Sequence, residues 1–330
     1  MEKRGNALAF PQILKTAGNG GTQPMTVLSK TKRMVKYNRA ETRAAWILLL
    51  PSVIGLTCIT YLPMLASFTL SLFSWNGLGE MKYIGMENYI KLFTRDSKFY
   101  GSLLTTLEYA GISVIGSVVY SMIIAMLRNR KVPARGFFRA IFYLPSVLPA
   151  LAVYLGWKWL YDYNHGFFNY VIKLMGGTSV KFLDSSSMVT PSLALIAVWL
   201  SGNLIVIFLA GLQNVPRTYH EAAEIDGANA WQRFWKITIP CMTPIIFYNL
   251  LMSLVSSLQV ITPALSLTKG GPGTGSYFMC YMLYTQAFKS HKYGYGSAIA
   301  VILFILIAIF TGILFATSKS WIFYEGDDKE

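Results

Sequence analysis

The sequence contains 330 residues, of which 54% are hydrophobic and 13% are charged. Soluble domains carry roughly 25% charged residues, so this chain has too few charges to cover a water-exposed protein of its length. The composition excludes an ordinary soluble domain and indicates a protein that crosses a membrane several times. A formal net charge of +14 would suit a nucleic-acid-binding protein. The basic residues lie between apolar segments, however, and this is the pattern of membrane topology. We therefore expect a lipid bilayer, and no nucleic acid, as a partner.

The apolar segments predict an all-α polytopic membrane protein. A helix crosses the bilayer core with about 20 apolar residues, and six segments meet this requirement. They are Ala44–Leu72, Leu103–Leu127, Phe137–Leu160, Pro191–Leu212, Cys241–Thr262 and Gly296–Thr317. The third and fourth are interrupted by Pro145, Pro149, Ser201, Gly202 and Asn203. Such interruptions are tolerated where a helix faces protein or a watery path.

The distribution of positive charge predicts the orientation. The segment 1–43, the loops after the second and fourth predicted helices, and the tail 318–330 hold 19 of the 29 Lys and Arg residues. Loops rich in Lys and Arg stay in the cytoplasm, so we expect both termini there. An even number of crossings requires the two termini to lie on the same side, and this agrees. The predicted organisation is a basic arm (1–43), a first transmembrane helix (44–72), a main transmembrane domain (101–317) and a tail (318–330). We expect the protein in the cell membrane.

The loop 214–240 predicts a helix–glycine–helix hairpin on the cytoplasmic side. Pro216 suits a first helical turn, Gly227 suits a left-handed helix end and Asn229 suits the cap of a second helix. Pro240 is expected to stop that second helix just before the fifth crossing. We refer to residues 214–240 as the hairpin.

Each arm of the hairpin presents a distinct face. The first has small and acidic residues at helical spacing: Tyr219, Ala222, Ala223 and Asp226. The second has bulky residues at the same spacing, which we expect to pack back onto the membrane domain: Trp231, Phe234, Trp235 and Thr238. Small residues let another protein approach closely, and carboxylates supply charge partners. We interpret the hairpin as a docking element stiff enough to transmit a push.

These residues resemble those of a known family. The run Glu221-Ala222-Ala223, the run Asp226-Gly227-Ala228, and the residues Phe234, Ile237 and Pro240 are similar to the EAA loop of binding-protein-dependent ABC importers. Residues 139–145, 267–273 and 287–298 resemble the sugar and glycerol-phosphate branch, the maltose type. The resemblance implies the fold of a type I importer transmembrane domain. It also implies that these nine hairpin residues couple the chain to an ATPase.

The same resemblance implies several partners. They are a second homologous permease, two ATPase subunits and an extracytoplasmic solute-binding protein. The sequence contains no G-x-x-x-x-G-K-[ST] phosphate loop, so we expect ATP and Mg²⁺ to bind the ATPase. We expect no catalytic residue, cofactor or metal in this chain, which would be a non-catalytic transport subunit.

Neutral polar residues inside the predicted helices are candidates for a solute pathway. These candidates are Asn203, Tyr248, Asn249, Ser253, Ser256 and Gln259. Asn249, Ser253 and Ser256 recur at the i, i+4, i+7 spacing of one helix face. Sugars need hydrogen-bonding groups and an aromatic surface, and Tyr248 and Trp199 would supply the surface. Polar contacts between helices are an equal alternative for this face. The acidic residue Glu108, near the start of the second crossing, is expected to have a structural or interfacial role, with contact to the substrate as the alternative.

The function predicted from the sequence is import of a sugar, an oligosaccharide or glycoside, through an ATP-driven ABC permease. Glycerol phosphate, peptide and amino acid remain alternative cargoes. An ion-driven secondary transporter is a second class, but it would require buried charges in mid-membrane and leaves the hairpin unexplained. A membrane scaffold without transport activity is a third.

Overall fold

A computed structural model describes residues 39–129 and 135–323, with side chains for 42–128 and 141–323. Most of the predicted arm 1–43 and the end of the predicted tail 318–330 lie outside the described residues. The chain divides into two units, Met1–Gly55 and Leu56–Glu330. In the first unit the described element is α1 (Arg39–Gly55). All other elements belong to the second unit.

The second unit is almost entirely helical in the described residues. It begins with the π-helical segment η1 (Leu56–Tyr61), α2 (Leu62–Leu70), the antiparallel strands β1 (Phe73–Ser74) and β2 (Lys82–Tyr83), α3 (Glu87–Thr94) and α4 (Phe99–Asn129). It continues with α5 (Arg135–Val147), α6 (Ala150–Leu160), α7 (Phe167–Leu174), α8 (Ser186–Trp199), α9 (Gly202–Asn214), α10 (Arg217–Ile225) and α11 (Ala230–Arg233). It ends with η2 (Phe234–Thr238), α12 (Ile239–Leu258), η3 (Ala264–Thr268), α13 (Met279–Tyr284), η4 (Thr285–Lys289) and α14 (Tyr293–Trp321).

Helix length agrees with an all-α protein of up to six crossings. Four described helices are long and apolar enough to cross a membrane: Thr42–Leu70, Phe99–Arg128, Ala230–Leu258 and Tyr293–Trp321. Two bent pairs meet the same test when each pair is taken as one crossing: Ile141–Val147 with Ala150–Leu160, and Ser186–Trp199 with Gly202–Asn214. The pairs correspond to the third and fourth predicted helices, the two that the sequence marks as interrupted.

The third predicted helix is not a straight span. Its two halves, α5 and α6, meet at an angle of 115°. Pro149 caps α6 with an extended backbone, φ −56° and ψ 124°, and it has no N–H to continue the helix. The halves of the fourth helix, α8 and α9, are bent by only 47°, and Ser201 is the N-cap of α9.

The helix that contains the fifth predicted crossing begins at Ala230, earlier than predicted, and the expectation that Pro240 stops a helix is wrong. A single helix runs from Ala230 to Leu258. Proline removes an N–H, and its ring clashes with the carbonyl four residues earlier. Just before Pro240 the helix widens into η2, where the Ile239 N–H bonds to the Phe234 carbonyl, five residues back. This π-turn accommodates the ring, and the hairpin is therefore continuous with α12.

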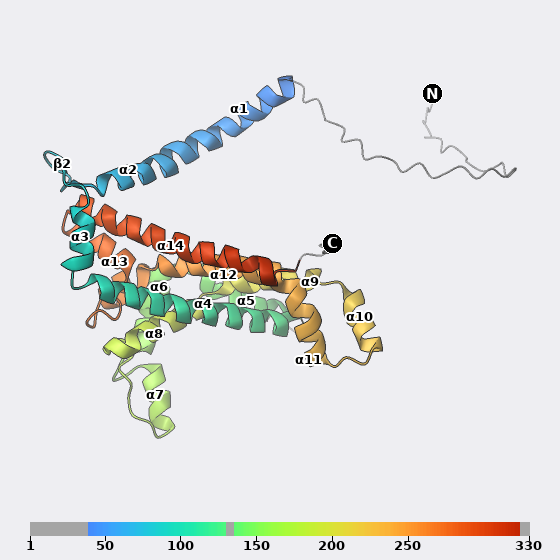
Figure 1. The fold of residues 1–330 in the computed structure, drawn as a ribbon. Coiled ribbons are helices and arrows are strands. Elements are labelled where there is room, and N and C mark those ends of the chain that lie inside the picture. The colour runs from blue at the N-terminus through green and yellow to red at the C-terminus, as the bar shows by residue number, and fades with distance from the viewer. Residues whose placement is uncertain (1–38, 130–134, 324–330) are drawn as a thin grey trace, which may run out of the picture. The chain divides into compact units, whose positions relative to one another are not determined.

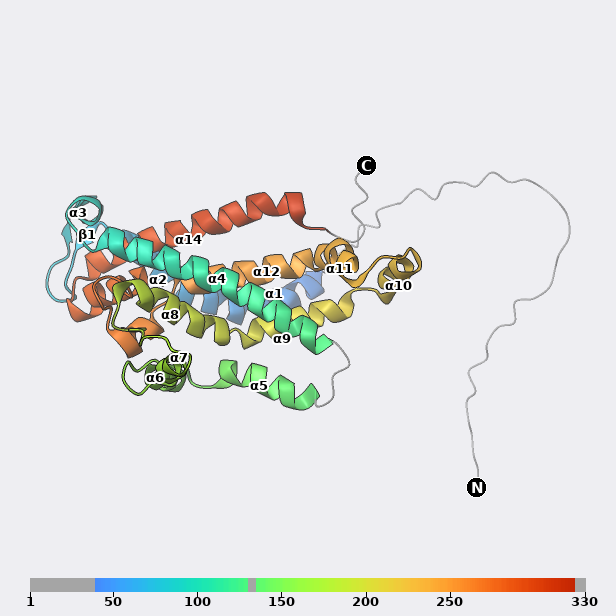
Figure 2. The same ribbon diagram turned by 90° about the horizontal axis from the view of Figure 1, so that it is seen from below.

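Helices α4, α9 and α12 pack against one another in the centre of the unit, with α8 on α4 and α14 on α12 (Figures 1 and 2). The hairpin projects from one end of this bundle, which we call the hairpin end. A buried apolar group fills the bundle near that end. We call it the inner cluster; it comprises Val118, Ile124, Ala125, Ile205, Phe208, Leu209, Leu212 and Met242.

At the opposite end, the connection between α2 and α4 is held against the start of α14. Asn88 is buried and donates to the carbonyls of Ser71 (2.8 Å) and Phe73 (3.0 Å). The Tyr295 hydroxyl donates to Asp96 at 2.7 Å. Gly294 lies so close to this connection that a Cβ there would collide with the Phe73 carbonyl oxygen.

This close approach predicts that Gly294→Ala destabilises the protein. Alanine favours a helix interior over glycine by up to ~1 kcal/mol, but overpacking against backbone costs about 1–3 kcal/mol. Gly312→Ala is the matched control, because it lies in the same helix with nothing within 4 Å of its added methyl. We expect thermal unfolding of the purified protein to show a lower Tm for Gly294→Ala and an unchanged or higher Tm for Gly312→Ala. Equal Tm values would contradict the close approach.

Candidate functional site

The turn of the hairpin is closed by backbone hydrogen bonds. Gly227 has a left-handed backbone, φ +78°, as predicted. Its N–H donates to the Glu224 carbonyl at 3.1 Å, and the Ala228 N–H donates to the Ala223 carbonyl at 2.8 Å. These two bonds form a Schellman motif, which satisfies carbonyls at the end of α10. The turn therefore has a defined geometry.

The second arm starts with a capping box. The Asn229 side chain accepts from the Gln232 N–H, and the Gln232 side chain accepts from the Asn229 N–H, both at 2.8 Å. The cap at Asn229 was predicted, whereas the part played by Gln232 was not. The N-x-x-Q spacing carries that signal.

An ion pair joins the two arms. The Arg233 guanidinium donates to the Glu224 carboxylate at 2.9 Å. This contact between Arg233 and Glu224 was not predicted from the sequence. Glu224 lies on α10 and Arg233 on α11. The pair therefore forms only because the turn brings the two arms together. Turn, cap and ion pair together give the hairpin one preferred shape.

The structure brings together five of the predicted coupling residues. Ala223, Asp226, Gly227, Ala228 and Ile237 line a hollow of about 410 Å³ between the arms, together with Gln232, Arg233 and Lys236. The remaining four lie around it. Glu221 and Ala222 are exposed on α10, while Phe234 and Pro240 are partly buried on the second arm.

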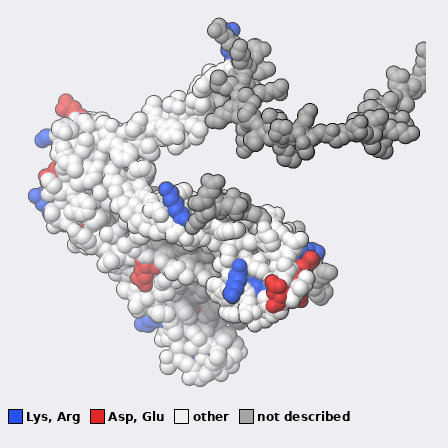
Figure 3. All heavy atoms as spheres, turned by 45° about the vertical axis from the view of Figure 1, so that its right-hand side comes forward, with Lys and Arg blue, Asp and Glu red and all other residues white. Residues whose placement is uncertain are grey.

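None of the residues of α10 is buried, and all but His220 and Ala223 are exposed, so this arm presents most of its surface. Figure 3 shows a mainly uncharged protein surface with scattered acidic and basic side chains, several of which lie together where the hairpin comes forward. The hairpin thus offers a charged surface with small residues at its centre, which suits contact with another protein.

The expected packing of the second arm is only partly correct. Phe234 and Thr238 are partly buried. Trp231 and Trp235 are 68% and 52% exposed, and they make tilted or edge-to-face contacts with Phe234 and with each other at 5.2–5.9 Å between ring centroids. The helix continues unbroken into α12, and its direction leaves both indoles at the surface. Exposed indoles suit a membrane–water interface.

A second hollow, of about 440 Å³, lies between α4, α8, α9 and α12. We call it the polar groove. Its lining consists of Tyr109, Ser113, Ser117, Ala197, Leu200, Ser201, Asn203, Leu204, Ile207, Tyr248, Met252, Ser253, Ser256 and Ser257. These residues include hydroxyls and one amide, and no Asp, Glu, Lys or Arg. Such a surface suits a neutral, hydroxyl-rich solute.

Four of the six pathway candidates line the polar groove: Asn203, Tyr248, Ser253 and Ser256. Asn249 is fully buried, and Gln259 is exposed at the C-terminal end of α12; neither lines it. Three lining residues on α4 were missed: Tyr109, Ser113 and Ser117. Their i, i+4, i+8 spacing places them on one helix face. Only the packing of α4 against α12 shows that this face lines the same hollow as Tyr248.

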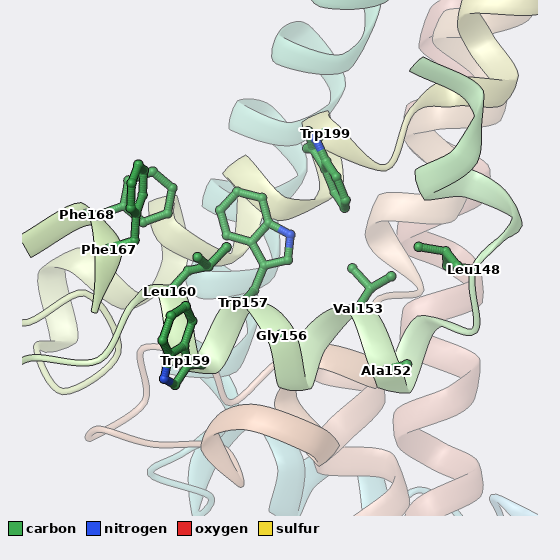
Figure 4. A pocket seen from close by; sticks show the side chains of 10 residues that line it. All are labelled: Leu148, Ala152, Val153, Gly156, Trp157, Trp159, Leu160, Phe167, Phe168 and Trp199. Atoms are coloured by element: carbon green, nitrogen blue, oxygen red, sulfur yellow. The ribbon is translucent and has the colours of Figure 1, made fainter. Parts of the chain in front are cut away.

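The expected aromatic pair, Tyr248 and Trp199, is divided between two hollows. Trp199 lines an apolar hollow of about 620 Å³ on α6, α7 and α8. Figure 4 shows Trp199 and Trp157 turned towards one another in this hollow, with ring centroids 5.6 Å apart. The aromatic surface of the polar groove therefore comes from Tyr248 and Tyr109.

Neither region has the donors of a metal centre. Among the described residues no group of three or more His, Cys, Asp or Glu side chains is placed to hold a metal ion. Glu108 precedes the groove residue Tyr109, but its side chain is exposed and does not line the groove.

Comparison with known proteins connects the hairpin and the groove to transport. Residues 117–322 match the family described as "Binding-protein-dependent transport system inner membrane component". The chain is 36% identical to the probable ABC transporter permease protein YesP of Bacillus subtilis, over 88% of this chain and 95% of that protein. It is 34% identical to the multiple sugar-binding transport system permease protein MsmF of Streptococcus mutans, over 84% of this chain and 95% of MsmF.

A solved structure shares the fold. A chain of a bacterial ABC transporter involved in the import of the acidic polysaccharide alginate superposes with a TM-score of 0.74 at 21% identity. The match covers 85% of this chain and 96% of that one. The matched family region includes the hairpin and the groove walls formed by α8, α9 and α12. On these grounds the chain belongs to the binding-protein-dependent transport system inner membrane components, the permease subunits of ABC transporters.

Proposed function

We propose that this chain forms the sugar pathway of an ATP-driven importer and is itself non-catalytic. One observation carries the proposal. The 29-residue helix Ala230–Leu258 contains the second arm of the hairpin at one end and the groove residues Tyr248, Ser253 and Ser256 at the other. A force applied to the hairpin therefore acts directly on a wall of the groove.

The proposed cargo is a neutral oligosaccharide or glycoside. The relative in Streptococcus mutans bears the name of a multiple sugar-binding transport system, and the polar groove offers hydroxyls, one amide and two tyrosine rings. Sugars bind to such surfaces through hydrogen bonds and stacking on aromatic faces. Glycerol phosphate would favour basic groups in the lining, and the described lining contains none.

The proposed assembly contains a second homologous permease, two ATPase subunits and an extracytoplasmic binding protein that delivers the sugar. ATP and Mg²⁺ would bind the ATPase subunits. The excess of Lys and Arg in alternate loops supports a cytoplasmic location for both termini and for the hairpin. The hairpin then faces the compartment that contains ATP.

The proposed mechanism is a nucleotide-dependent shift between two arrangements. A ligand shifts such an equilibrium only through a difference in its affinity for the two states. ATP would favour the closed ATPase dimer, the hairpin would move with it, and α12 would move with the hairpin. Ala222 and Ala223 permit close contact with the ATPase, and Glu221 supplies a charge for a basic partner.

This proposal predicts that Glu221→Lys separates the permease from its ATPase. Glu221 is exposed on α10, and reversing its charge removes one attraction and adds a repulsion. We expect at least tenfold less ATPase to co-purify with the tagged variant when the partner permease and ATPase are co-expressed. Glu80→Lys is the matched control, because Glu80 is exposed at the opposite end of the unit, and it should retain the native amount.

Retention of the ATPase by Glu221→Lys would show that α10 is not the contact. Absence of any ATPase from the native preparation would contradict the proposed assembly and would favour an ion-driven transporter, whose uptake should then collapse with an uncoupler of the ion gradient.

A second prediction concerns cargo. Tyr248→Ala should raise the KM for sugar uptake in proteoliposomes about tenfold or more, because stacking on an aromatic face contributes about 1–3 kcal/mol to binding in comparable cases. Tyr170→Ala is the control, since Tyr170 is exposed on α7 away from the groove lining. Equal KM values for the two variants would remove the polar groove from the pathway.

A further inference from the structure

Asn249 is an anomaly in the middle of α12. Its side chain is completely buried, and neither its Nδ2 nor its Oδ1 has a hydrogen-bond partner among the described residues. Buried polar side chains in folded proteins nearly always have partners. The few that lack them store strain or are completed by an ordered water, an ion, a ligand or a second conformation.

The position of Asn249 along α12 indicates which explanation applies. Residues three, four and seven apart share a helix face, so Asn249 shares its face with Met242 on one side and with Ser253 and Ser256 on the other. Met242 belongs to the inner cluster, whereas Ser253 and Ser256 line the polar groove. Asn249 therefore lies between them on this face, at the level of the groove-lining residue Tyr248 but with its own side chain buried.

The two neighbouring helices also contain residues of both regions. On α4 the lining residue Ser117 is followed, towards the hairpin end, by Val118 of the inner cluster. On α9 the lining residues Leu204 and Ile207 alternate with Ile205 and Phe208 of the inner cluster, so the two sets lie on different faces of that helix. The inner cluster therefore adjoins the polar groove, and Asn249 is buried between these two regions.

A neighbouring pair of polar side chains, between α4 and the start of α9, is already hydrogen-bonded. The Ser121 hydroxyl lies 2.8 Å from the Ser201 hydroxyl and 3.2 Å from the Ser201 carbonyl oxygen. This pair fastens α4 to the start of α9 and has no need of a ligand. Asn249 differs because both its donor and its acceptor are unused.

We infer that Asn249 is a sugar-binding residue that is withheld in this conformation and becomes exposed when α12 moves with the hairpin. The inference rests on the proposed function. The movement adds the Asn249 amide to the lining of the polar groove, beside Tyr248. The Nδ2 then donates to one sugar hydroxyl while the Oδ1 accepts from its neighbour, a pairing that fits a neutral vicinal diol.

The same geometry predicts how Asn249 biases the transporter. In the conformation with Asn249 buried, the amide has lost its hydrogen bonds to water and has gained none from the protein. When Asn249 lines the groove, the amide regains hydrogen bonds to water or sugar. Leucine has a similar size and no polar atoms, so Asn249→Leu removes the energetic cost of burying the amide and also removes the sugar contact.

The test uses the complete transporter in proteoliposomes, with the binding protein and the fastest-imported of maltose, trehalose and raffinose. Asn249→Leu should raise the Tm of the resting transporter and lower uptake at least tenfold. Asn249→Ser, which retains a hydroxyl, should recover part of the uptake. Asn203→Leu is the matched control for loss of an amide, because Asn203 is exposed in the groove; it should leave the Tm unchanged.

Thiol labelling tests the exposure of position 249 directly. In a background with Cys58, Cys241 and Cys280 replaced by alanine, Asn249→Cys should react with a hydrophilic methanethiosulfonate reagent at least tenfold faster during turnover than at rest. Asn203→Cys should react in both conditions.

Native uptake by Asn249→Leu, a lowered Tm, or labelling that is equally slow during turnover would each overturn the inference and leave Asn249 a packing residue. The proposed function would fail differently, because a native transporter that imports none of the three sugars contradicts it before any variant is compared.

Discussion

The structure depends on one requirement, which is that the helix Ala230–Leu258 keeps its backbone hydrogen-bonded while it passes two prolines. In a bilayer every backbone polar group must be satisfied within the protein. Pro240 removes one donor near the start of α12, and Pro244 removes another one turn later. The π-turn η2 accommodates Pro240, so the chain continues as a helix where the prolines would favour a break.

The other features of the site follow from that continuity. A break at Pro240 would leave the hairpin as an independent loop, with no mechanical connection to the groove. With the helix intact, the Schellman turn at Gly227, the capping box at Asn229 and the Arg233–Glu224 pair make α10 a rigid extension of α12. Exposed ion pairs of this kind are worth little by themselves, about 0–1 kcal/mol. Combined with two backbone motifs, this one helps to select a single angle between the arms.

Local features were predictable from the sequence, and tertiary ones were not. Gly227 and Asn229 have roles set by their own backbone conformation, and the chain breaks near Pro149 and Ser201 where the residue types indicate. The expectation for Pro240 was wrong because the sequence rule assumes α-helical geometry and does not anticipate a π-turn. The face containing Asn249, Ser253 and Ser256 was grouped correctly by periodicity. Its division between buried core and groove depends on how α4 and α9 pack against it.

The rigid connection between the hairpin and the groove is tested most directly by loosening η2 in a pair of variants that lose the same side-chain contacts. Trp235 and Lys236 are exposed, and the double variant Trp235→Gly/Lys236→Gly differs from Trp235→Ala/Lys236→Ala mainly in helix propensity, by about 1 kcal/mol per residue. If this connection is rigid, both variants should bind the ATPase and support ATP hydrolysis, and only the glycine variant should lose sugar uptake. Equal uptake by the two variants would contradict a rigid connection between the hairpin and the groove.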